Sequence, residues 1–352
     1  MTKLEDVYTK YWDLMPPLAR SSYIRGDVVY ILDETKLPHQ LYYIESRDYR
    51  RSVWAIREMK TRAGGQTLTI VNTMVLELRK NSHLEGRKLL KYMAKVAQAL
   101  GKARPTAPLL GIAMKVYEWI ERACNEGGDI VKVVEEEASK FLETIFENKL
   151  AFARHAANII DDGFTVLTHC NISGGMVLVA RECKRQGKNV KYIVTETRPY
   201  LQGSRLTAWE LSVEGFNVTL IPDHMVASII SRGVVDLVIV GCDRCARNGD
   251  IANKIGTFQI ALACFEYNIP FYVWVTSLDY SIPTGKDIPV ERRSENEMIY
   301  YNGQRLYCNG VKAYYPAFDI TPAKYISGFI TAKGVIPPRL AYKYEFLRGV
   351  EF

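Results

Sequence analysis

Cys170 and Asp243 are the residues best suited to chemistry, because each follows an apolar run that is typical of a buried strand. A cysteine thiolate acts as a nucleophile or a base, and a position just before a helix favours the ionised form. Asp243 is a candidate general acid if burial raises its pKa, or it is simply the partner of Arg244. A cysteine taken alone is more often a small buried hydrophobic residue. A thiol, a carboxylate and several cations at the ends of separate strands weaken that interpretation.

Lys254 and Gln202 are the candidates for binding an anionic group. Asn253 and Lys254 open a helix that we predict over residues 252–268, and Gln202 begins another over residues 201–214. Backbone N–H groups point outward at a helix N-terminus, so that a phosphate group can bind there. For Lys254 alone, a solvated lysine is an equally good interpretation.

Neither a metal nor an organic cofactor is expected. Cys242 and Cys245 have the Cys-x-x-Cys spacing of zinc sites, but no second pair completes a site. No Gly-x-Gly-x-x-Gly sequence follows the first strand of the second half, which argues against a dinucleotide.

The sequence pattern of the second half of the chain predicts a β-sheet, and one edge of this sheet would bring these residues together. Apolar, β-branched runs alternate with amphipathic helical stretches at residues 164–169, 190–195, 218–221, 235–240 and 271–275. Such alternation is typical of parallel strands that helices cover on both faces. We therefore predict an α/β fold in which residues 151–352 form a doubly wound, Rossmann-like catalytic domain. Ligands bind such sheets at the carboxyl ends of the strands, where the polar residues named above fall.

The first half predicts a separate N-terminal α+β domain over residues 1–150, with small strands and several helices. The expected strands cover residues 28–32 and 40–44, and the expected helices cover residues 50–59, 84–100, 109–126 and 131–157.

Composition narrows the classes of partner. The net charge of +7 comes from 46 Lys and Arg against 39 Asp and Glu, which favours anionic ligands. No block of Lys and Arg resembles a nucleic-acid-binding tail, so we expect no nucleic acid. No apolar run reaches 18 residues, and we expect neither a membrane span nor a secretory signal. Seven scattered cysteines favour a reducing cytoplasm.

Five segments resemble the methylthioribose-1-phosphate isomerase family. They are Leu-Asp-Glu-Thr-Lys-Leu-Pro (32–38), the segment from Glu-Thr-Arg-Pro to Trp-Glu-Leu (196–211), Gly-Cys-Asp-Arg-Cys-Ala-Arg-Asn-Gly-Asp-Ile-Ala-Asn-Lys-Ile-Gly-Thr (241–257), Thr-Gly-Lys-Asp-Ile-Pro-Val-Glu-Arg-Arg-Ser (284–294) and Pro-Ala-Phe-Asp-Ile-Thr-Pro (316–322). The likeness extends from about residue 28 to residue 335. The superfamily also contains ribose-1,5-bisphosphate isomerases and regulatory subunits of the initiation-factor exchange complex.

The resemblance implies an enzyme that converts an aldose 1-phosphate into a ketose 1-phosphate, in methionine salvage. It makes Cys170, within Thr-His-Cys-Asn (168–171), the catalytic thiol and Asp243 the catalytic aspartate. The regulatory subunits generally lack this pair. The resemblance also implies a set of phosphate-binding positions, in which Ala63 and Gly64 form the loop beside the first arginine. These positions are Arg62, Ala63, Gly64, Arg104, Gln202, Asn253 and Lys254. A homodimer or a larger homo-oligomer is also implied.

Two departures from the family pattern concern the group at C5 of the sugar. The isomerases usually carry Arg-Gly-Ala-Pro where this chain has Arg62-Ala63-Gly64-Gly65. The segment after Cys170 runs straight into a helix, more like the ribose-1,5-bisphosphate branch. A methylthio group, a methyl group and a phosphate therefore remain alternatives at C5, and a non-catalytic regulatory subunit is the alternative from another class. The sequence also leaves open whether a proton or a hydride moves between C2 and C1.

Overall fold

The computed structural model describes residues 3–104, 109–301 and 303–348 and contains two compact units. Their boundary falls between Asn148 and Lys149, within the long helix α6 (Ile130–Asn158). Whether the units fold independently, as the predicted division near residue 150 implies, stays a prediction. None of the helices in the described residues combines the length and the apolar composition that a membrane span needs.

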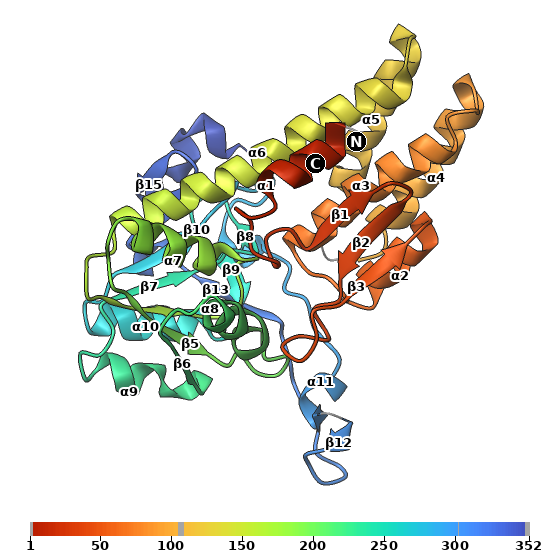
Figure 1. Cartoon of the computed structure of the whole chain (residues 1–352). Coiled ribbons are helices and arrows are strands. Elements are labelled where there is room, and N and C mark those ends of the chain that lie inside the picture. Colours follow the sequence, from red (N-terminus) through yellow and green to blue (C-terminus); the bar gives the residue numbers. More distant parts are fainter. Residues whose placement is uncertain (1–2, 105–108, 302, 349–352) are drawn as a thin grey trace. The chain divides into compact units, whose positions relative to one another are not determined.

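The first unit contains a small antiparallel sheet of β1 (Ser22–Arg25), β2 (Val28–Leu32) and β3 (Tyr43–Ser46), in that order (Figure 1). Its helices are α1 (Lys3–Tyr11), α2 (Tyr49–Arg57), α3 (Gly64–Lys80), α4 (Gly86–Gly101), α5 (Leu109–Glu126) and the first part of α6. Helix α2 begins where the carboxylate of Asp48 accepts hydrogen bonds from the backbone N–H groups of Arg50 and Arg51. Helix α3 packs against β1, β2 and α5.

A seven-stranded sheet forms the centre of the second unit. Its order is β15-β14-β10-β7-β4-β5-β6. The parallel strands are β4 (Thr165–Thr168), β5 (Lys191–Thr195), β6 (Val218–Ile221), β7 (Leu237–Val240), β10 (Phe271–Trp274) and β14 (Gly328–Thr331), while the edge strand β15 (Gly334–Ile336) is antiparallel. Numbered along the chain, the six parallel strands have the order 3-2-1-4-5-6, which is that of a doubly wound fold. The predicted α/β fold class is confirmed.

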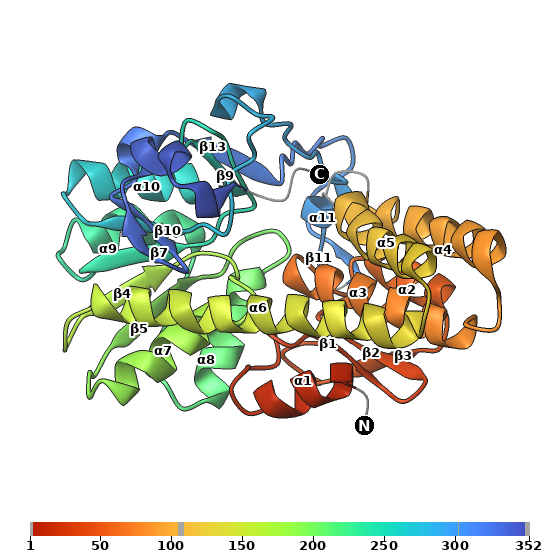
Figure 2. The same ribbon diagram turned by 90° about the horizontal axis from the view of Figure 1, so that it is seen from above.

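Helices cover both faces of this sheet. The connecting helices are α7 (Gly175–Arg185), the π-helix η1 (Gly203–Ala208) with α8 (Trp209–Val213), the short η2 (Asp223–Met225) with α9 (Val226–Ile230), and α10 (Thr257–Glu266). Figure 2 shows α7 and α8 on one side of the sheet and α9 and α10 on the other. The strands are apolar for this reason, and all four residues of β7 are buried.

The helix predicted over residues 252–268 is wrong in its first turn. Residues Ile251–Lys254 form strand β9, which lies between β8 (Arg244–Cys245) and β13 (Phe318–Thr321) in a three-stranded antiparallel sheet. Pairing with β13, which is distant in the sequence, outweighs the local helical pattern. Helix α10 begins only after Gly256, whose φ of +104° suits glycine.

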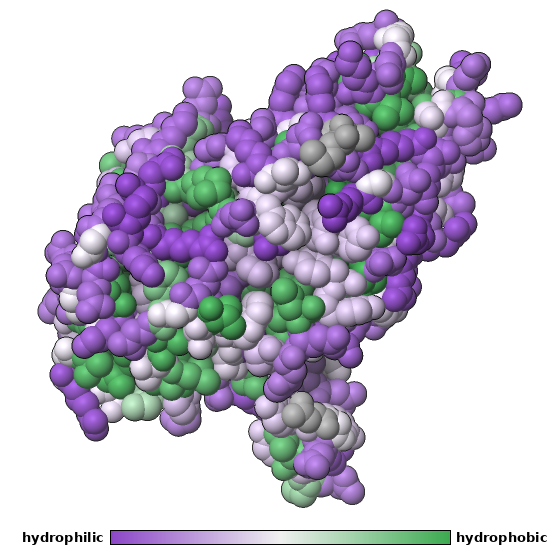
Figure 3. Space-filling view, in the orientation of Figure 1, coloured by the Kyte–Doolittle hydropathy of each residue, from purple (hydrophilic) through white to green (hydrophobic). Residues whose placement is uncertain are grey.

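A short hairpin follows in the second unit, formed by α11 (Asn296–Ile299), β11 (Tyr300–Tyr301) and β12 (Gln304–Arg305). Large apolar side chains are exposed here, among them Tyr300, Tyr301 and Leu306. Figure 3 shows apolar surface on this segment. The hairpin therefore contributes surface to the second unit rather than core.

Candidate active site

Cys170 and Asp243 lie at the carboxyl ends of the two strands between which the strand order reverses. Cys170 follows β4 by two residues, and Asp243 follows β7 by three. The two strands are parallel neighbours, with Leu167 opposite Val238. In open α/β sheets, the crevice at this reversal is the usual ligand site. The structure therefore places both residues where the strand-end argument expects them.

The backbone of Cys170 is held in an uncommon conformation by two hydroxyl groups. Its φ is +66°, in the left-handed region that non-glycine residues rarely adopt. Such a conformation costs about 1–3 kcal/mol and persists only where the surroundings enforce it. The N–H of Cys170 donates to Oγ1 of Thr197 at 2.9 Å, and the hydroxyl of Thr207 donates to the Cys170 carbonyl at 2.6 Å.

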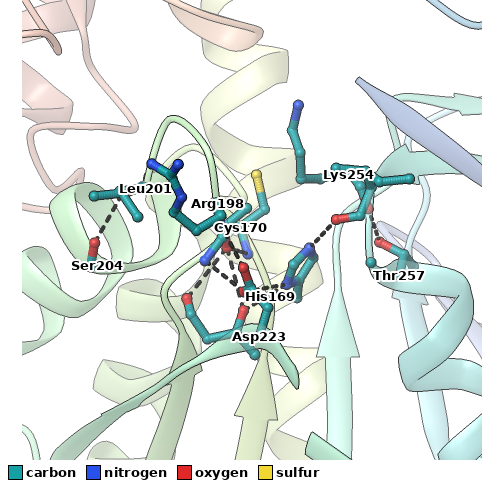
Figure 4. A network of polar contacts seen from close by, with 12 residues as sticks. His169, Cys170, Arg198, Leu201, Ser204, Asp223, Lys254 and Thr257 are labelled. Atoms are coloured by element: carbon teal, nitrogen blue, oxygen red, sulfur yellow. Dashed lines mark hydrogen bonds and ion pairs between the residues drawn. The ribbon is translucent and has the colours of Figure 1, made fainter. Parts of the chain in front are cut away.

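Thr197 is itself held by a carboxylate from the next strand end. It is fully buried, follows β5 and has a φ of +62°. Its N–H donates to Oδ1 of Asp223 at 2.7 Å, and the N–H of Arg198 donates to Oδ2 at 2.7 Å (Figure 4). The guanidinium of Arg198 lies near the hairpin, 6.0 Å from the ring of Tyr301.

His169 is buried and links three segments of the rim. Its Nδ1 lies 2.6 Å from the hydroxyl of Thr195, and its Nε2 lies 3.0 Å from the carbonyl oxygen of Ile255. Burial lowers the pKa of His169 to about 4, although Asp223, 3.9 Å away, acts in the opposite direction. His169 is therefore neutral near pH 7.

The predicted helix after Cys170 exists, but residues 171–174 separate Cys170 from the start of α7. The Asn171 side chain spans this loop, since its Oδ1 accepts from the N–H of Ser173 and its Nδ2 donates to Thr207. Lys149 donates to the carbonyl oxygen of Ser173 at 2.9 Å, and burial lowers its pKa to about 8. The loop is thus fixed by side chains of α6, η1 and its own residues.

Asp243 differs from the prediction in its burial, because its side chain is exposed. Its backbone N–H donates to the carbonyl oxygen of Ala252 at 3.0 Å, which continues the β8–β9 ladder. Arg244 forms an ion pair with Asp279, with 3.8 Å between Nε and Oδ2. The carboxylate of Asp243 is accessible to a ligand, but the burial that the general-acid argument invoked is not present.

Lys254 is buried, yet it does not lie at a helix N-terminus as predicted. It ends β9, and its Nζ lies 4.8 Å from the ring of Phe318. The N-terminus of α10 is occupied by Asp319, which accepts from the N–H groups of Gly256 and Phe258. Burial raises the pKa of Asp319 to about 6. The cationic group of Lys254, rather than the helix end beside it, is therefore the feature suited to an anion.

Figure 4 shows how the polar side chains of this rim are directed. The side chains of Cys170, Arg198 and Lys254 extend to the same side, away from the ends of the strands. Asn253, one residue before Lys254, is buried, and its amide donates to the hydroxyl of Thr257 at 3.0 Å. A thiol and two cations of the second unit are thus presented together.

Gln202 carries a buried acceptor that is suited to a ligand donor. It immediately precedes η1 and is 4% exposed. Among the described residues, its Oε1 has no hydrogen-bond partner. A buried polar atom without a hydrogen bond destabilises the folded protein unless a ligand or a water molecule bonds to it. The neighbouring Gly203 is required for close packing, because a Cβ there would meet the Thr195 carbonyl oxygen at 1.7 Å.

The remaining predicted positions lie in the first unit, three of them at the start of α3 and Arg104 just after α4. The N–H of Arg62 donates to Oε1 of the buried Glu34 at 3.0 Å, and burial raises the pKa of Glu34 to about 7. Ala63, with a φ of +40°, precedes Gly64, the first residue of α3. Arg104 donates to the side chain of Gln66, on α3, at 3.4 Å. Residues 105–107, which follow Arg104 in the sequence Arg-Pro-Thr-Ala, lie outside the described residues. Phosphate binding by these residues stays a prediction.

Sequence reasoning missed Asp223, Thr207 and Glu34. The signal for Asp223 was present, because it follows the apolar run at residues 218–221 just as Cys170 follows its own run. Applying the strand-end argument to the third strand would have found it. Thr207 and Glu34 lie within the family-like segments 196–211 and 32–38, but nothing in those segments shows which residues they contact.

Comparison with known proteins gives the family. The sequence model of the initiation factor 2 subunit family matches residues 63–338. The chain belongs to this family. Among its relatives in the family, the methylthioribose-1-phosphate isomerase of Fervidobacterium nodosum is 41% identical over 328 residues, which cover 89% of this chain and 93% of the relative. The isomerase of the same name from Geobacter metallireducens is 40% identical, with 89% and 94% covered. The predicted resemblance is confirmed.

Two solved structures have a similar fold, and one is an isomerase while the other is an initiation factor subunit. The 5-methylthioribose 1-phosphate isomerase of Pyrococcus horikoshii OT3 has a TM-score of 0.83 at 30% identity, with 94% of this chain and 96% of that chain covered. The delta subunit of the translation initiation factor eIF-2B from A. fulgidus has a TM-score of 0.81 at 33% identity, with 92% and 99% covered. Fold similarity alone therefore does not separate an enzyme from an initiation factor subunit, whereas the residues of the site differ between the two.

Proposed function

We propose that this chain is an aldose–ketose isomerase that converts methylthioribose 1-phosphate into methylthioribulose 1-phosphate. The observation that carries the proposal is the position of Cys170 and Asp243 on the two strands that flank the reversal of strand order. The relatives that bear the isomerase name are 36–41% identical over about nine-tenths of this chain.

The substrate explains why a thiol and a carboxylate are needed together. Phosphate at C1 leaves no free aldehyde to enolise, so the furanose ring must first open. Asp243 is exposed on the rim, so the proposal requires that the bound substrate covers its carboxyl group. The carboxyl group then protonates the ring oxygen as the bond from that oxygen to C1 breaks. The Cys170 thiolate then removes the proton from C2, a double bond forms between C1 and C2, and the Cys170 thiol, whose proton exchanges with solvent, delivers a proton to C1. The C2 hydroxyl gives its proton to the Asp243 carboxylate as the ketone forms, which restores the acid, and the reaction needs no oxidant or reductant.

A hydride shift from C2 to C1 is the alternative route through the same site. In that case Cys170 and Asp243 move protons only among oxygen atoms. Solvent deuterium at C1 of the product supports proton transfer, and its absence favours the hydride shift.

Phosphate binding is assigned to Lys254, Asn253 and Gln202 in the second unit. Lys254 supplies a buried positive charge, and Gln202 supplies a buried acceptor that suits a hydroxyl group near the phosphate. For the first unit by itself, we propose that Arg62 and Arg104, with the backbone N–H groups of the Ala63–Gly64 turn, bind phosphate. Binding energy from these groups would orient the sugar for proton transfer.

The deciding experiment is a coupled product assay that offers methylthioribose 1-phosphate, 5-deoxyribose 1-phosphate and ribose 1,5-bisphosphate to the purified protein. Cys170→Ser tests the thiol, and Cys308→Ser, at an exposed cysteine of the second unit, is the matched control. Turnover of methylthioribose 1-phosphate that is lost only in Cys170→Ser supports the proposal. Preferred turnover of ribose 1,5-bisphosphate assigns the other isomerase activity, and ligand binding without turnover assigns a regulatory subunit.

We further propose a homodimer or larger homo-oligomer that acts in the cytoplasm on a small-molecule sugar phosphate. Light scattering coupled to size-exclusion chromatography measures the mass of the assembly, and a mass of about 40 kDa at working concentration contradicts the oligomer.

A further inference from the structure

The carboxylate of Asp223 fixes the direction of the chain after β5. Its two oxygens accept from consecutive backbone N–H groups, those of Thr197 and Arg198, both at 2.7 Å. Asp223 comes from a different strand end, because it is the first residue of η2 after β6. Two charge-assisted hydrogen bonds from one carboxylate define both the position and the orientation of the peptide that they hold.

Thr197 transmits this constraint to Cys170. The Oγ1 atom of Thr197 accepts the N–H of Cys170 at 2.9 Å, and both residues have φ angles above +60°. Rotation about φ carries the Cβ of a residue around its N–Cα bond, so the φ of Cys170 sets the direction of its Cα–Cβ bond and limits the directions that its sulfur can take through χ1. Figure 4 shows this sulfur directed to the same side as the Nζ of Lys254, with Asp223 below both.

We infer that Asp223 is a positioning residue for the reaction, and that it acts through Thr197 to hold Cys170 in the left-handed conformation that directs its thiol toward the substrate. The inference rests on the proposed function, because it assumes that Cys170 reacts. It assigns Asp223 no contact with substrate. It predicts instead that the Thr197 hydroxyl matters for the chemical step although a fully buried threonine cannot reach the ligand.

Thr197→Val and Thr197→Ser form the test pair. Valine keeps the β-branched shape and removes the acceptor for the Cys170 N–H, while serine keeps the acceptor and removes a methyl group. We expect kcat to fall about tenfold to hundredfold in Thr197→Val with KM changed by less than about threefold, and to recover in Thr197→Ser. Asp223→Asn should lower kcat in the same way, because an amide presents only one acceptor atom to the two N–H groups.

A second readout follows the thiol directly. The rate of alkylation of Cys170 by iodoacetamide, measured on the Cys170 peptide by mass spectrometry across pH 6 to 10, should change in Thr197→Val and not in Thr197→Ser. Thr331→Val is the stability control, since it also removes a buried hydroxyl that bonds to a carbonyl oxygen, in the turn between β14 and β15. Its alkylation profile should equal that of the wild type.

Wild-type kcat and an unchanged alkylation profile in folded Thr197→Val would overturn the inference. Equal losses in Thr197→Val and Thr197→Ser would also overturn it, because they would indicate packing rather than the hydrogen bond. If Cys170→Ser retains full turnover, the proposed function fails. The alkylation profiles still decide whether Thr197 controls the thiol in that case, so the two failures are distinguishable.

Discussion

The Nε2 nitrogen of His169 lies 3.0 Å from the carbonyl oxygen of Ile255, a residue 86 positions later in the chain. A carbonyl oxygen only accepts, so Nε2 carries the proton, and Nδ1 accepts from the hydroxyl of Thr195. A neutral imidazole thus joins the end of β4 to the end of β5 and to the segment between β9 and α10. With both nitrogens engaged, His169 organises the rim rather than transferring protons.

We predict that His169 makes the protein sensitive to acid. Its pKa is lowered from 6.5 to about 4, so between these values the unfolded chain binds a proton that the folded chain does not. The contribution to the free energy of unfolding is complete above pH 6.5 and falls by about 3 kcal/mol as the pH drops to 4. Urea unfolding of wild type and His169→Gln at several pH values measures this. The difference between them should shrink or reverse toward pH 4, and parallel curves would contradict the prediction.

Glu34 should have the opposite pH dependence. Burial raises its pKa from 4.5 to about 7, and the positive charge of Arg62 offsets only part of this effect. Above pH 4.5 the unfolded chain releases a proton that the folded chain keeps, so stability is lost as the pH rises toward 7. Glu34→Gln removes the titration, and its stability relative to wild type should rise by up to about 3 kcal/mol between pH 4.5 and 7. Thermal unfolding in matched buffers checks this, and a difference that does not change with pH counts against it.

Loss of the Lys254 charge should weaken substrate binding. In Lys254→Met, which keeps the length of the buried stem, we expect KM to rise about tenfold to hundredfold, since a hydrogen bond to a charged group contributes about 1.5–3 kcal/mol. Lys324→Met, at an exposed lysine of the same unit, is the control. Steady-state kinetics with the sugar phosphate distinguishes them. Equal KM values for Lys254→Met and the control would remove Lys254 from the phosphate site.

Asp243 should affect the chemical step far more than binding. Asp243→Asn keeps the size of the side chain but cannot donate a proton as an acid, and we expect kcat to fall about 10²- to 10⁴-fold with little change in KM. Asp236→Asn is the matched control, because Asp236 lies at the opposite end of β7 and accepts from the N–H of Thr165. Single-turnover kinetics separates the chemical step from product release. Full turnover in Asp243→Asn would require another acid.

The parallel sheet could be predicted because its strands carry their own signal. Strand β6 (Val218–Ile221) and helix α5 (Leu109–Glu126) have the predicted bounds, and β4, β5, β7 and β10 differ only at their ends. Strands β4, β7 and β10 are mostly buried on both faces, which gives a continuous apolar run, whereas the edge strand β6 is partly exposed. The positions of Cys170 and Asp243 then follow from the rule that ligands bind at the carboxyl ends of such strands.

Helix α3 and strand β9 could not be found in the same way. Thirteen of the 17 residues of α3 are buried, including Asn72, Thr73 and Glu77, so the helix lacks the polar face that reveals an amphipathic helix. The strand β9 depends on pairing with β13, more than sixty residues away. Likewise, the contacts of Asp223 with Thr197 and Arg198 join separate strand ends, and no local pattern encodes them.

Thr197 and Thr207 bond to the main-chain N–H and C=O of Cys170, so neither bond involves the sulfur. The loop can therefore keep its shape after the thiol is lost, and at a φ of +66° glycine or asparagine would fit more easily than cysteine. Under the proposed function, one substitution at Cys170 would leave a receptor for the same ligand on an unchanged scaffold. A family that includes both isomerases and initiation factor subunits is the evolutionary outcome that such a loop allows.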